Sequence, residues 1–454
     1  MINSIIQKYN VPGPRYTSYP TVPYWDENKF DLATWKDCLA NSIKESNHSE
    51  GISIYIHLPF CESLCTFCGC NKRITKRHDV EEVYIEAVLK EWEMYLTMFP
   101  EIPIIKELHL GGGTPTFFRP ENLEMLVKGI FKEAIKSADF EYSFEGHPNN
   151  TTKAHLQTLY DVGFRRVSFG VQEYNPIVQK AIHRIQPFQN VANVTLWARE
   201  IGYTSISHDL IFGLPFQTLE HVRDTIEKTK SLNPDRISFY SYAHVPWIKG
   251  NGQRGFDEAN LPKDEEKRIL YEEGKLLLAE NGYYEIGMDH FALKSDSMYD
   301  AFVNGMLHRN FMGYSASKTK VMIGLGVSAI GDTWDCFSQN EKKLEDYYDA
   351  IELGQLPICR GHSLTKEDLI LRKHILNLMC RFETSWESEK DYFPQLNEVL
   401  ISLAEMEHDG LLNFTANGIT VTEEGKAFVR NICMAFDLRL KRNAPTTKLF
   451  SMTV

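Results

Sequence analysis

Four of the chain's nine cysteines lie within ten residues, between Cys61 and Cys70. Cys61, Cys65 and Cys68 have the spacing C-x3-C-x2-C, and Cys70 follows two residues later. Zinc sites usually combine two cysteine pairs that lie far apart in the sequence, and no second pair is present here. Three closely spaced thiolates can instead bind three irons of a 4Fe–4S cluster and leave the fourth iron open. The spacing therefore favours an iron–sulfur cluster over zinc or an incidental group of cysteines.

The role of Cys70 is open from spacing alone. It could bind the fourth iron, which would close the site and leave a cluster fit only for electron transfer. Because one residue separates it from Cys68, ligation of one cluster by both would be strained. We therefore expect Cys70 to lie beside the cluster. The other five cysteines are scattered, and we expect them to be reduced thiols, several of them buried.

A glycine-rich segment and several polar residues come near the ends of other strand-like runs. The segment GGGT occupies residues 111–114. Glycines let a backbone edge approach a ligand closely and offer N–H donors to it. Glu145, Gln172 and Asp209 end or lie within later strand-like runs, and Arg184 follows in HRIQ. Each residue alone is equally consistent with a structural role, but together they predict a binding surface.

The elements that must position these residues alternate between strand and helix. Strand-like runs lie at 52–58, 106–111, 141–146, 165–171, 205–213 and 236–243, and helix-like segments include 80–96 and 218–232. This alternation predicts βαβ units and a parallel sheet. Six units would form a partial TIM-like (β/α)6 barrel, an α/β fold with its chemistry at the carboxyl ends of the strands.

The pattern changes from about residue 262, and from about 360 it becomes rich in helices. An Asn417-Gly418 turn between apolar runs predicts a hairpin and a small, winged-helix-like C-terminal domain. We divide the chain into an N-terminal segment over the barrel mouth (1–48), a catalytic barrel with an extension (49–355) and a helical C-terminal domain (356–454).

Composition excludes several classes of protein. The net charge of −12 argues against a nucleic-acid partner. The sequence has no apolar run fit for a signal peptide or a membrane span. We therefore expect a cytoplasmic protein with reduced cysteines, no membrane partner and a monomeric state.

The C-x3-C-x2-C spacing, with Phe67 just before the third cysteine, resembles the signature of the radical SAM enzymes. The GGGT segment one strand later resembles their glycine-rich turn. In these enzymes S-adenosylmethionine (SAM) binds the open iron, and an electron from the cluster cleaves it to a 5′-deoxyadenosyl radical. The protein supplies binding, orientation and exclusion of water and oxygen.

Segments along almost the whole chain resemble the family of oxygen-independent coproporphyrinogen III oxidases. They are PGPRYTSYPT at 12–21, YIHLPFCESLCTFCGCNK at 55–72, HLGGGTPTFF at 109–118, GVQEYN at 170–175, DLIFGLP at 209–215, NPDRISFYSYAHVP at 233–246, GMDHFA at 287–292 and LHRNFMGY at 307–314. The resemblance implies the anaerobic oxidative decarboxylation of two propionates of coproporphyrinogen III to vinyls in haem biosynthesis. It also implies that one SAM is consumed for each propionate and that the cluster is reduced by a protein such as flavodoxin or ferredoxin.

The resemblance also assigns residues to one 4Fe–4S cluster and two SAM molecules. Cys61, Cys65 and Cys68 are the implied cluster ligands, and Cys70 is not one. The implied contacts of the cluster-bound SAM are Tyr55, Gly112, Glu145 and Ile330, of which Tyr55 and Glu145 are also the implied catalytic residues. The implied contacts of the second SAM are Phe67, Gly113, Thr114, Gln172, Arg184, Asp209 and Ala243.

Basic residues are candidate partners of the substrate's propionates. Arg15 is a physical candidate because an arginine can bind a carboxylate through two hydrogen bonds; it is as consistent with holding its own segment in place. His290, Arg309 and His308 are further candidates.

Two departures from the family pattern bear on the second SAM. His147 stands where many bacterial members have Asp, and Met312 stands where many have Gln.

Three alternatives remain at this stage. One is a haem chaperone on the same scaffold, although such proteins typically lack the PRYTSYP segment and the fourth cysteine. Another is a radical SAM methyltransferase or haem-ring-opening enzyme, for which Met312 is the one hint. The third is a zinc-bound scaffold or regulator.

Overall fold

The protein is built around one large sheet, seen in a computed structural model that describes residues 2–26, 30–247, 252–253, 255–388 and 391–453. Six neighbouring strands of this sheet run parallel. They are β1 (Ile52–Leu58), β4 (Ile104–Gly112), β5 (Ile135–Gly146), β6 (Arg166–Gln172), β7 (Ser205–Phe212) and β8 (Arg236–Ser241). The six strands match the six strand-like runs of the sequence, so the expected α/β class with a parallel sheet is confirmed.

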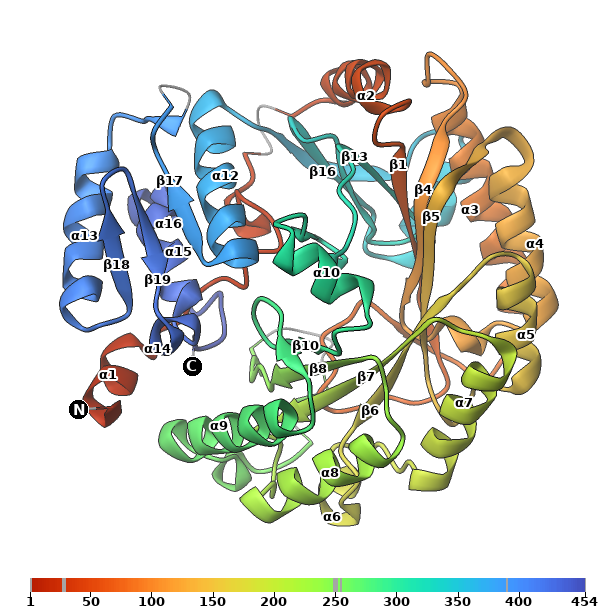
Figure 1. Cartoon of the computed structure of the whole chain (residues 1–454). Helices are drawn as coiled ribbons and strands as arrows, with labels where there is room; N and C mark the ends of the chain where they lie inside the picture. Colours follow the sequence, from red (N-terminus) through yellow and green to blue (C-terminus); the bar gives the residue numbers. More distant parts are fainter. Residues whose placement is uncertain (1, 27–29, 248–251, 254, 389–390, 454) are drawn as a thin grey trace.

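Helices between these strands cover the outer face of the sheet (Figure 1). They are α3 (Val80–Leu96), α4 (Pro120–Ile130), α5 (Lys153–Asp161), α6 (Pro176–Ala181), α7 (Phe188–Ile201) and α8 (Leu219–Ser231). Local sequence sets where several begin: Thr152 and Thr218 start α5 and α8 with capping boxes that satisfy end N–H groups. Helix α3 buries Tyr84 and Trp92 in the main core. The strand–helix alternation of the sequence therefore corresponds to a curved sheet with helices outside it.

The sheet continues beyond the six expected strands to twelve in all among the described residues. Strand β13 (Val321–Leu325) lies parallel to β1 on its outer edge, and β14 (Ile330–Asp332), β15 (Cys336–Asn340) and β16 (Ile358–Ser363) follow antiparallel. At the other edge β10 (His290–Ala292) and β9 (Tyr284–Glu285) pair antiparallel. The sequence did not indicate these strands because most of them are short, and because β13 and β10 join the sheet by pairing with strands remote in the chain.

The remaining elements of this part lie around the sheet. They are α2 (Leu32–Ser46), β2 (Phe60–Cys61), β3 (Arg73–Ile74), α9 (Asp264–Glu280), α10 (Ser297–Val303), β11 (His308–Asn310), β12 (Gly313–Ser315) and α11 (Leu344–Glu352), with 3-10 turns at Val22–Tyr24, Pro115–Phe117, Phe131–Glu133 and Glu258–Asn260. Trp35 of α2 is fully buried in the main core, so α2 belongs to the sheet rather than to the C-terminal part.

The C-terminal part is rich in helices, as expected, and has its own apolar core. It contains α12 (Lys366–Arg381), α13 (Leu396–His408), α14 (Glu423–Lys426), α15 (Val429–Phe436) and α16 (Leu438–Arg442), with a small sheet of β17 (Glu383–Ser385), β19 (Gly418–Val421) and β18 (Leu412–Thr415). Strands β18 and β19 form the expected hairpin.

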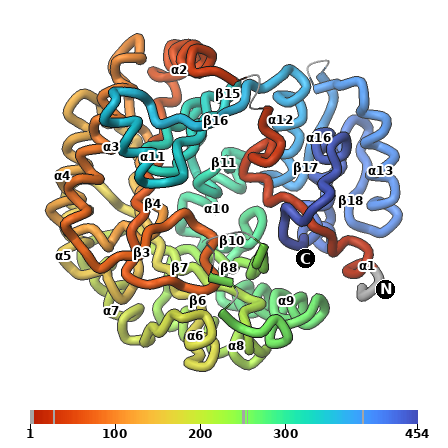
Figure 2. The backbone as a smooth tube through the Cα atoms, turned by 180° about the vertical axis from the view of Figure 1, so that it is seen from behind, coloured from red at the N-terminus to blue at the C-terminus, as the bar shows by residue number. Residues whose placement is uncertain are grey.

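The N-terminal segment lies along the C-terminal part (Figure 2). It begins with α1 (Ile2–Tyr9). Tyr16 and Tyr19 are buried in the core of the C-terminal part, and Pro12 forms a bridge with Met452. The described residues of this N-terminal segment are thus shared between two cores, and the boundaries after 48 and 355 stay predictions.

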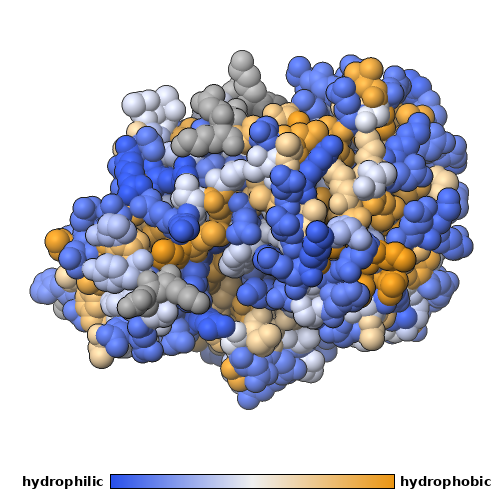
Figure 3. Space-filling model, turned by 90° about the horizontal axis from the view of Figure 1, so that it is seen from above, coloured by the Kyte–Doolittle hydropathy of each residue, from blue (hydrophilic) through white to orange (hydrophobic). Residues whose placement is uncertain are grey.

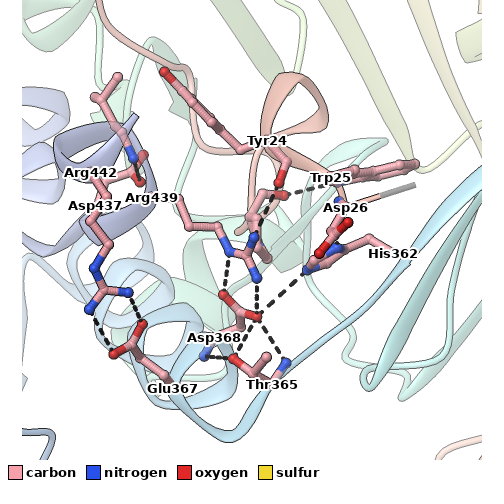
Figure 4. Close-up of polar contacts among 12 residues, drawn as sticks. Tyr24, Trp25, Asp26, His362, Thr365, Glu367, Asp368, Asp437, Arg439 and Arg442 are labelled. Atoms are coloured by element: carbon pink, nitrogen blue, oxygen red, sulfur yellow. Dashed lines mark hydrogen bonds and ion pairs between the residues drawn. The ribbon is translucent and has the colours of Figure 1, made fainter. Parts of the chain in front are cut away.

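A buried carboxylate joins the C-terminal helices to the rest of the chain (Figure 4). Asp368 at the start of α12 accepts two hydrogen bonds of 2.7 Å from Arg439 of α16. His362 Nε2 of β16 lies 3.6 Å from the same carboxylate, and its Nδ1 accepts from the N–H of Asp26 at 3.0 Å. Burial alone raises the pKa of Asp368, but the hydrogen bonds from Arg439 and Thr365, together with the nearby His362, hold it well below its ordinary value.

The surface carries apolar side chains without a large continuous patch on the face that Figure 3 shows, where hydrophilic residues are interspersed with hydrophobic ones. Scattered apolar side chains of this kind are ordinary on protein surfaces. Within the described ranges, no helix combines the length and apolar character needed to cross a membrane.

Candidate active site

The cysteine loop follows β1 at the carboxyl ends of the parallel strands. It is anchored by β2, which pairs with β3: the N–H of Arg73 donates to Pro59 O at 2.8 Å and that of Thr75 to Cys61 O at 2.9 Å. The loop borders a cavity of about 310 Å³ that is lined by Cys61, Cys65, Cys68 and Cys70. The strand end and the short β2–β3 pair therefore bring all four thiols to one cavity.

The thiols differ in their surroundings. The side chains of Cys61, Cys65 and Cys68 are half-buried, whereas Cys70 is exposed. Burial raises the pKa of Cys61 to about 11. A hydrogen bond from Cys70 lowers the pKa of Cys68 to about 6, with help from Lys72, and the same pairing keeps the pKa of Cys70 well above its usual value. The structure thus distinguishes Cys70 from the other three by its exposure.

The donor set fits a 4Fe–4S cluster. Among the described residues, no three His, Cys, Asp or Glu side chains form a group that could hold a single metal ion; three thiolates that each bind a separate iron do not need to meet at one point. Arg184 lies beside the thiols, with its Nη1 3.7 Å from Cys65 Sγ. Its buried Nε has no hydrogen-bond partner among the described residues, which leaves a donor for a bound group.

The glycine-rich segment packs directly against the cysteine loop. The N–H of Gly113 donates to Leu58 O at 2.8 Å. A Cβ atom on Gly113 would lie 2.5 Å from Pro59 O and 3.0 Å from Cys61 Sγ, and Gly112 has φ +118°. Thr114 Oγ1 lies 3.3 Å from Cys61 Sγ. Glycine is required here because β4 ends against the loop with no room for a side chain.

Tyr55 of β1 lies between the imidazole rings of His57 and His109. Its hydroxyl donates to His57 Nδ1 at 3.0 Å, since the other nitrogen of His57 donates to Asn71 O at 2.9 Å. Burial lowers the pKa of His57, which keeps it neutral. The ring of Tyr55 stacks on His109, with centroids 5.9 Å apart, and His109 Nε2 lies 3.6 Å from Glu145 Oε1. The two residues expected to be catalytic are therefore linked through His109.

Most of the residues expected to contact the second SAM line the same cavity. Phe67, Gly113, Thr114, Gln172, Arg184 and Asp209 all border it. Gln172 is held at φ +69° at the end of β6, a strained conformation for a residue other than glycine. Burial and the charge of Glu145 raise the pKa of Asp209 to about 6, and Ser168 Oγ donates to it at 2.9 Å.

Three of the expected cofactor contacts, Tyr55, Ala243 and Ile330, do not border this cavity. Ala243 is joined to the cysteine loop by Gln253, whose amide donates to Ala243 O at 2.9 Å and to Phe67 O at 3.1 Å. The backbone of Ile330 packs on Gly324, the β13 residue in register with Tyr55. Gln253 could not be predicted from the sequence, because its role depends on the carbonyl of Phe67, which is remote in the chain.

The candidate propionate partners do not line the cysteine cavity. Arg15 Nη2 donates to Ser241 O at 3.0 Å, and its Nη1 lies 3.6 Å from Asp289 Oδ2. Arg309 donates to the carbonyl oxygens of Tyr16 and Arg15, both at 3.3 Å. Arg309 therefore holds the N-terminal segment in place.

The two candidate histidines are neutral. Burial lowers the pKa of His290 and of His308 to about 3. His290 Nδ1 donates to Met288 O at 2.8 Å, so Nε2 accepts from the hydroxyl of Tyr240 at 3.2 Å. A neutral imidazole offers no positive charge to a carboxylate, which leaves the arginine and lysine side chains for that task.

A second, polar cavity of about 140 Å³ lies on the inner side of the curved sheet, lined by residues of its parallel strands, and was not expected from the sequence. It shares Glu145, Ser168 and Asp209 with the cysteine cavity. Met312 and His290 line this inner cavity, whereas His147 lines the cysteine cavity. The two departures from the family pattern are thus in different places.

Parallel strands with a three-cysteine loop at their carboxyl ends define this chain as a radical SAM protein, and residues 55–229 match the family model of the Radical SAM superfamily. Proteins named oxygen-independent coproporphyrinogen III oxidase are similar along the whole chain. The Helicobacter pylori (strain J99) protein is 40% identical over 96% of both chains, and the Escherichia coli (strain K12) protein is 38% identical over 97% of this chain and 96% of its own.

A solved structure agrees with these relatives. The structure of coproporphyrinogen III oxidase (HemN) from Escherichia coli has a TM-score of 0.87 and 37% identity, covering 93% of this chain and 97% of that one. The chain belongs to the family of oxygen-independent coproporphyrinogen III oxidases. The expected family is thereby confirmed.

Proposed function

We propose that this protein oxidatively decarboxylates two propionates of coproporphyrinogen III to vinyls and so forms protoporphyrinogen IX. The observation that carries the proposal is the full-length similarity to oxidases of this name, combined with a three-cysteine cavity at the strand ends. In each half of the reaction a hydrogen atom leaves the propionate β-carbon, carbon dioxide is released, and one electron passes to an acceptor.

Each residue of the site has a task in this proposal. Cys61, Cys65 and Cys68 would hold a 4Fe–4S cluster, and the backbone edge of Gly112 and Gly113 would bind the methionine part of SAM. When bound, the cluster and SAM supply a 5′-deoxyadenosyl radical that removes the hydrogen atom. Glu145 lines the cavity half-exposed, placed to accept hydrogen bonds from ribose hydroxyls.

We propose that a second SAM binds in the same cavity to Gln172, Arg184 and Asp209. The buried Nε of Arg184, which has no partner among the described residues, supports a polar ligand there. The cavity of about 310 Å³ lies at the lower end of ligand-site volumes.

Further parts of the proposal concern the protein's surroundings. We infer a cytoplasmic monomer that receives single electrons from a protein such as flavodoxin or ferredoxin and has no nucleic-acid or membrane partner. The net charge of −12 supports the exclusion of nucleic acid.

The deciding experiment is an anaerobic assay of the reconstituted protein with reductant, SAM and coproporphyrinogen III. We expect protoporphyrinogen IX and two molecules of carbon dioxide for every two molecules of SAM consumed. An intact cluster that forms 5′-deoxyadenosine but neither product would contradict the proposal.

A further inference from the structure

A third cavity lies where the N-terminal segment, α9 and α15 meet. Its volume is about 40 Å³. Its lining includes four charged residues from different elements: Arg15, Lys267 of α9, Arg430 of α15 and Asp289. None of the cysteine-loop residues borders it, so it is separate from the cavity in which the cofactors are proposed to bind.

Positive charge predominates among these residues. The remaining charged side chains of the lining have ion-pair partners: Arg268 with Glu272, Lys426 with Glu423, and Glu285 with Lys275. Among the described residues, this leaves the cations of Arg15, Lys267 and Arg430 facing one lining carboxylate, that of Asp289. Asp289 and Arg430 are buried, and burying unbalanced charge is costly unless an opposite charge is supplied.

The donors of Arg430 and Lys267 differ in availability. Arg430 donates to the carbonyls of Pro14 and Met452 at 2.9 Å, so its guanidinium is used to fasten both chain ends. Within the described part of the chain, the ammonium of Lys267 makes one hydrogen bond, to Tyr242 O at 3.2 Å. An ammonium group has three protons to donate. Lys267 is therefore the cation that can still receive an acceptor.

The position of Lys267 is set by close packing. A Cβ atom on Gly213 would lie 2.9 Å from Lys267 Cε, and Gly213 has φ +82°. The glycine after β7 thus makes room for the lysine stem. Burial, together with the charges of Arg15 and Arg430, lowers the pKa of Lys267 to about 8 and outweighs the opposite effect of Asp289 and Asp264.

The size of the cavity suits a small anionic group. At about 10–15 Å³ for each water, a cavity of about 40 Å³ holds roughly three heavy atoms, as many as one carboxylate contains. Phe212 of β7 borders this cavity, whereas Asp209 of the same strand borders the cysteine cavity. The two residues are roughly 10 Å apart along the strand and point to opposite faces of it. Tyr240 and His290, which are next to Ser241 and Asp289 in the chain, border the inner polar cavity, and that cavity shares Asp209 with the cysteine cavity. The inner cavity thus adjoins both places.

We propose that Lys267, with Arg15, binds the carboxylate of a propionate that is not decarboxylated. This inference rests on the proposed function, because it takes coproporphyrinogen III as the substrate. A reacting propionate must meet the radical in the cysteine cavity, whereas this cavity lies beyond the end of β7. The site therefore anchors the tetrapyrrole by its far side.

The test compares three reconstituted holoenzymes: wild type, Lys267→Met and the control Lys228→Met. Methionine keeps the length of the lysine side chain and removes its charge. The control variant removes the same charge from Lys228, which forms an exposed ion pair with Asp224. We expect Lys267→Met to raise the KM for coproporphyrinogen III about tenfold, the loss of one charge-assisted hydrogen bond. The kcat and the KM for SAM should match those of the wild type, and Lys228→Met should change none of the three.

Inhibition by the product locates the propionate. Protoporphyrinogen IX keeps only the two propionates that do not react, so its inhibition constant should also rise about tenfold in Lys267→Met. A raised KM with unchanged product inhibition would show that the site holds a reacting propionate and would overturn the assignment.

Two further outcomes decide against the site. A folded, active Lys267→Met enzyme with the wild-type KM would overturn the assignment of Lys267 as a propionate partner. If inorganic phosphate then stabilised the wild type, but not the variant, against thermal unfolding, the cavity would be a site for small ions. If the wild type forms no protoporphyrinogen, the proposed function is wrong. The role of Lys267 is then tested separately, by measuring the dissociation constants of coproporphyrin III for wild type and Lys267→Met in fluorescence titrations. Equal dissociation constants for wild type and variant would overturn it.

Discussion

Cys70 and the three expected cluster ligands lie in one cavity, yet their side chains are not equivalent. Cys70 is the exposed member of the four, and its thiol keeps its proton when Cys68 ionises. The exposure of Cys70 therefore agrees with the spacing argument that it lies beside the cluster.

Substitution of these cysteines should separate their roles. We expect Cys65→Ser to lose the cluster and all activity, because it removes one of three iron ligands. Cys70→Ser should keep the iron and sulfide content of the wild type. Both are measured by iron and sulfide analysis and by visible absorbance of anaerobic samples. Loss of iron from Cys70→Ser would show that the ligand assignment is wrong.

At the level of elements, the site depends on how closely β4 approaches the loop after β1. Gly113 lies in contact with the backbone of Pro59 and with Cys61 Sγ. We expect Gly113→Ala to displace the loop and to lower activity about 100-fold, the scale of a 1 Å misplacement in an active site.

A matched glycine provides the control for this variant. Gly69 lies in the cysteine loop itself, and a Cβ there would meet nothing within 4 Å. Gly69→Ala should keep near-normal cluster content and SAM cleavage, both measured anaerobically. Equal losses of cluster content and SAM cleavage in the two variants would contradict this prediction. They would mean that the loop is sensitive to any added side chain and that the close contact with β4 is not the cause.

A buried carboxylate of α3 holds the turn after β13. Glu91 accepts hydrogen bonds from Gly326 N and Tyr347 Oη at 2.8 Å and from Asn340 Nδ2 at 2.6 Å. Burial nevertheless raises its pKa from 4.5 to about 7. The folded protein therefore holds a proton between these pH values that the unfolded chain has already released.

Stability should consequently fall as pH rises from about 4.5 to about 7 and become level above that range. The full contribution is about 3 kcal/mol. We expect Glu91→Gln to flatten this dependence in thermal unfolding curves recorded across the range. Glu93→Gln, on the exposed side of the same helix, should leave the wild-type slope. An unchanged slope in Glu91→Gln would contradict the assigned titration.

At the scale of the whole molecule, the ends of the chain complete the structure around the barrel. Tyr16 and Tyr19 pack in the C-terminal core, Arg309 and Arg430 hold the segment around Arg15, and Asp368 ties α12 to α16. The anchor proposed for the substrate lies at this junction, so its geometry depends on correct docking of the C-terminal part.

Breaking this junction should be costly only where the ion pair is buried. Arg439→Met leaves the Asp368 carboxylate without its main partner, and we expect a loss of about 3–5 kcal/mol. Arg442→Met breaks the more exposed pair with Glu367 (Figure 4) and should cost less than about 1 kcal/mol. Denaturant unfolding of the C-terminal part measures both. Equal effects would show that burial of Asp368 does not govern the junction.

The sequence alone determined the local features of this protein. Cysteine spacing, the glycine segment and the strand–helix alternation lie within short stretches, and periodicity reports which face of each stretch is buried. The six parallel strands, the helix at 80–96 and the gathering of Glu145, Gln172 and Asp209 at one edge could be predicted for this reason.

Only the tertiary structure decided which groups are charged and which are paired. It showed that His290 and His308 are neutral, that Arg309 holds backbone carbonyls, that β13 extends the sheet, and that Lys267 faces a cavity with too few carboxylates. These properties depend on burial and on partners far apart in the chain. Desolvation and long-range pairing leave no periodic trace in a sequence, so they appear only once the chain is folded.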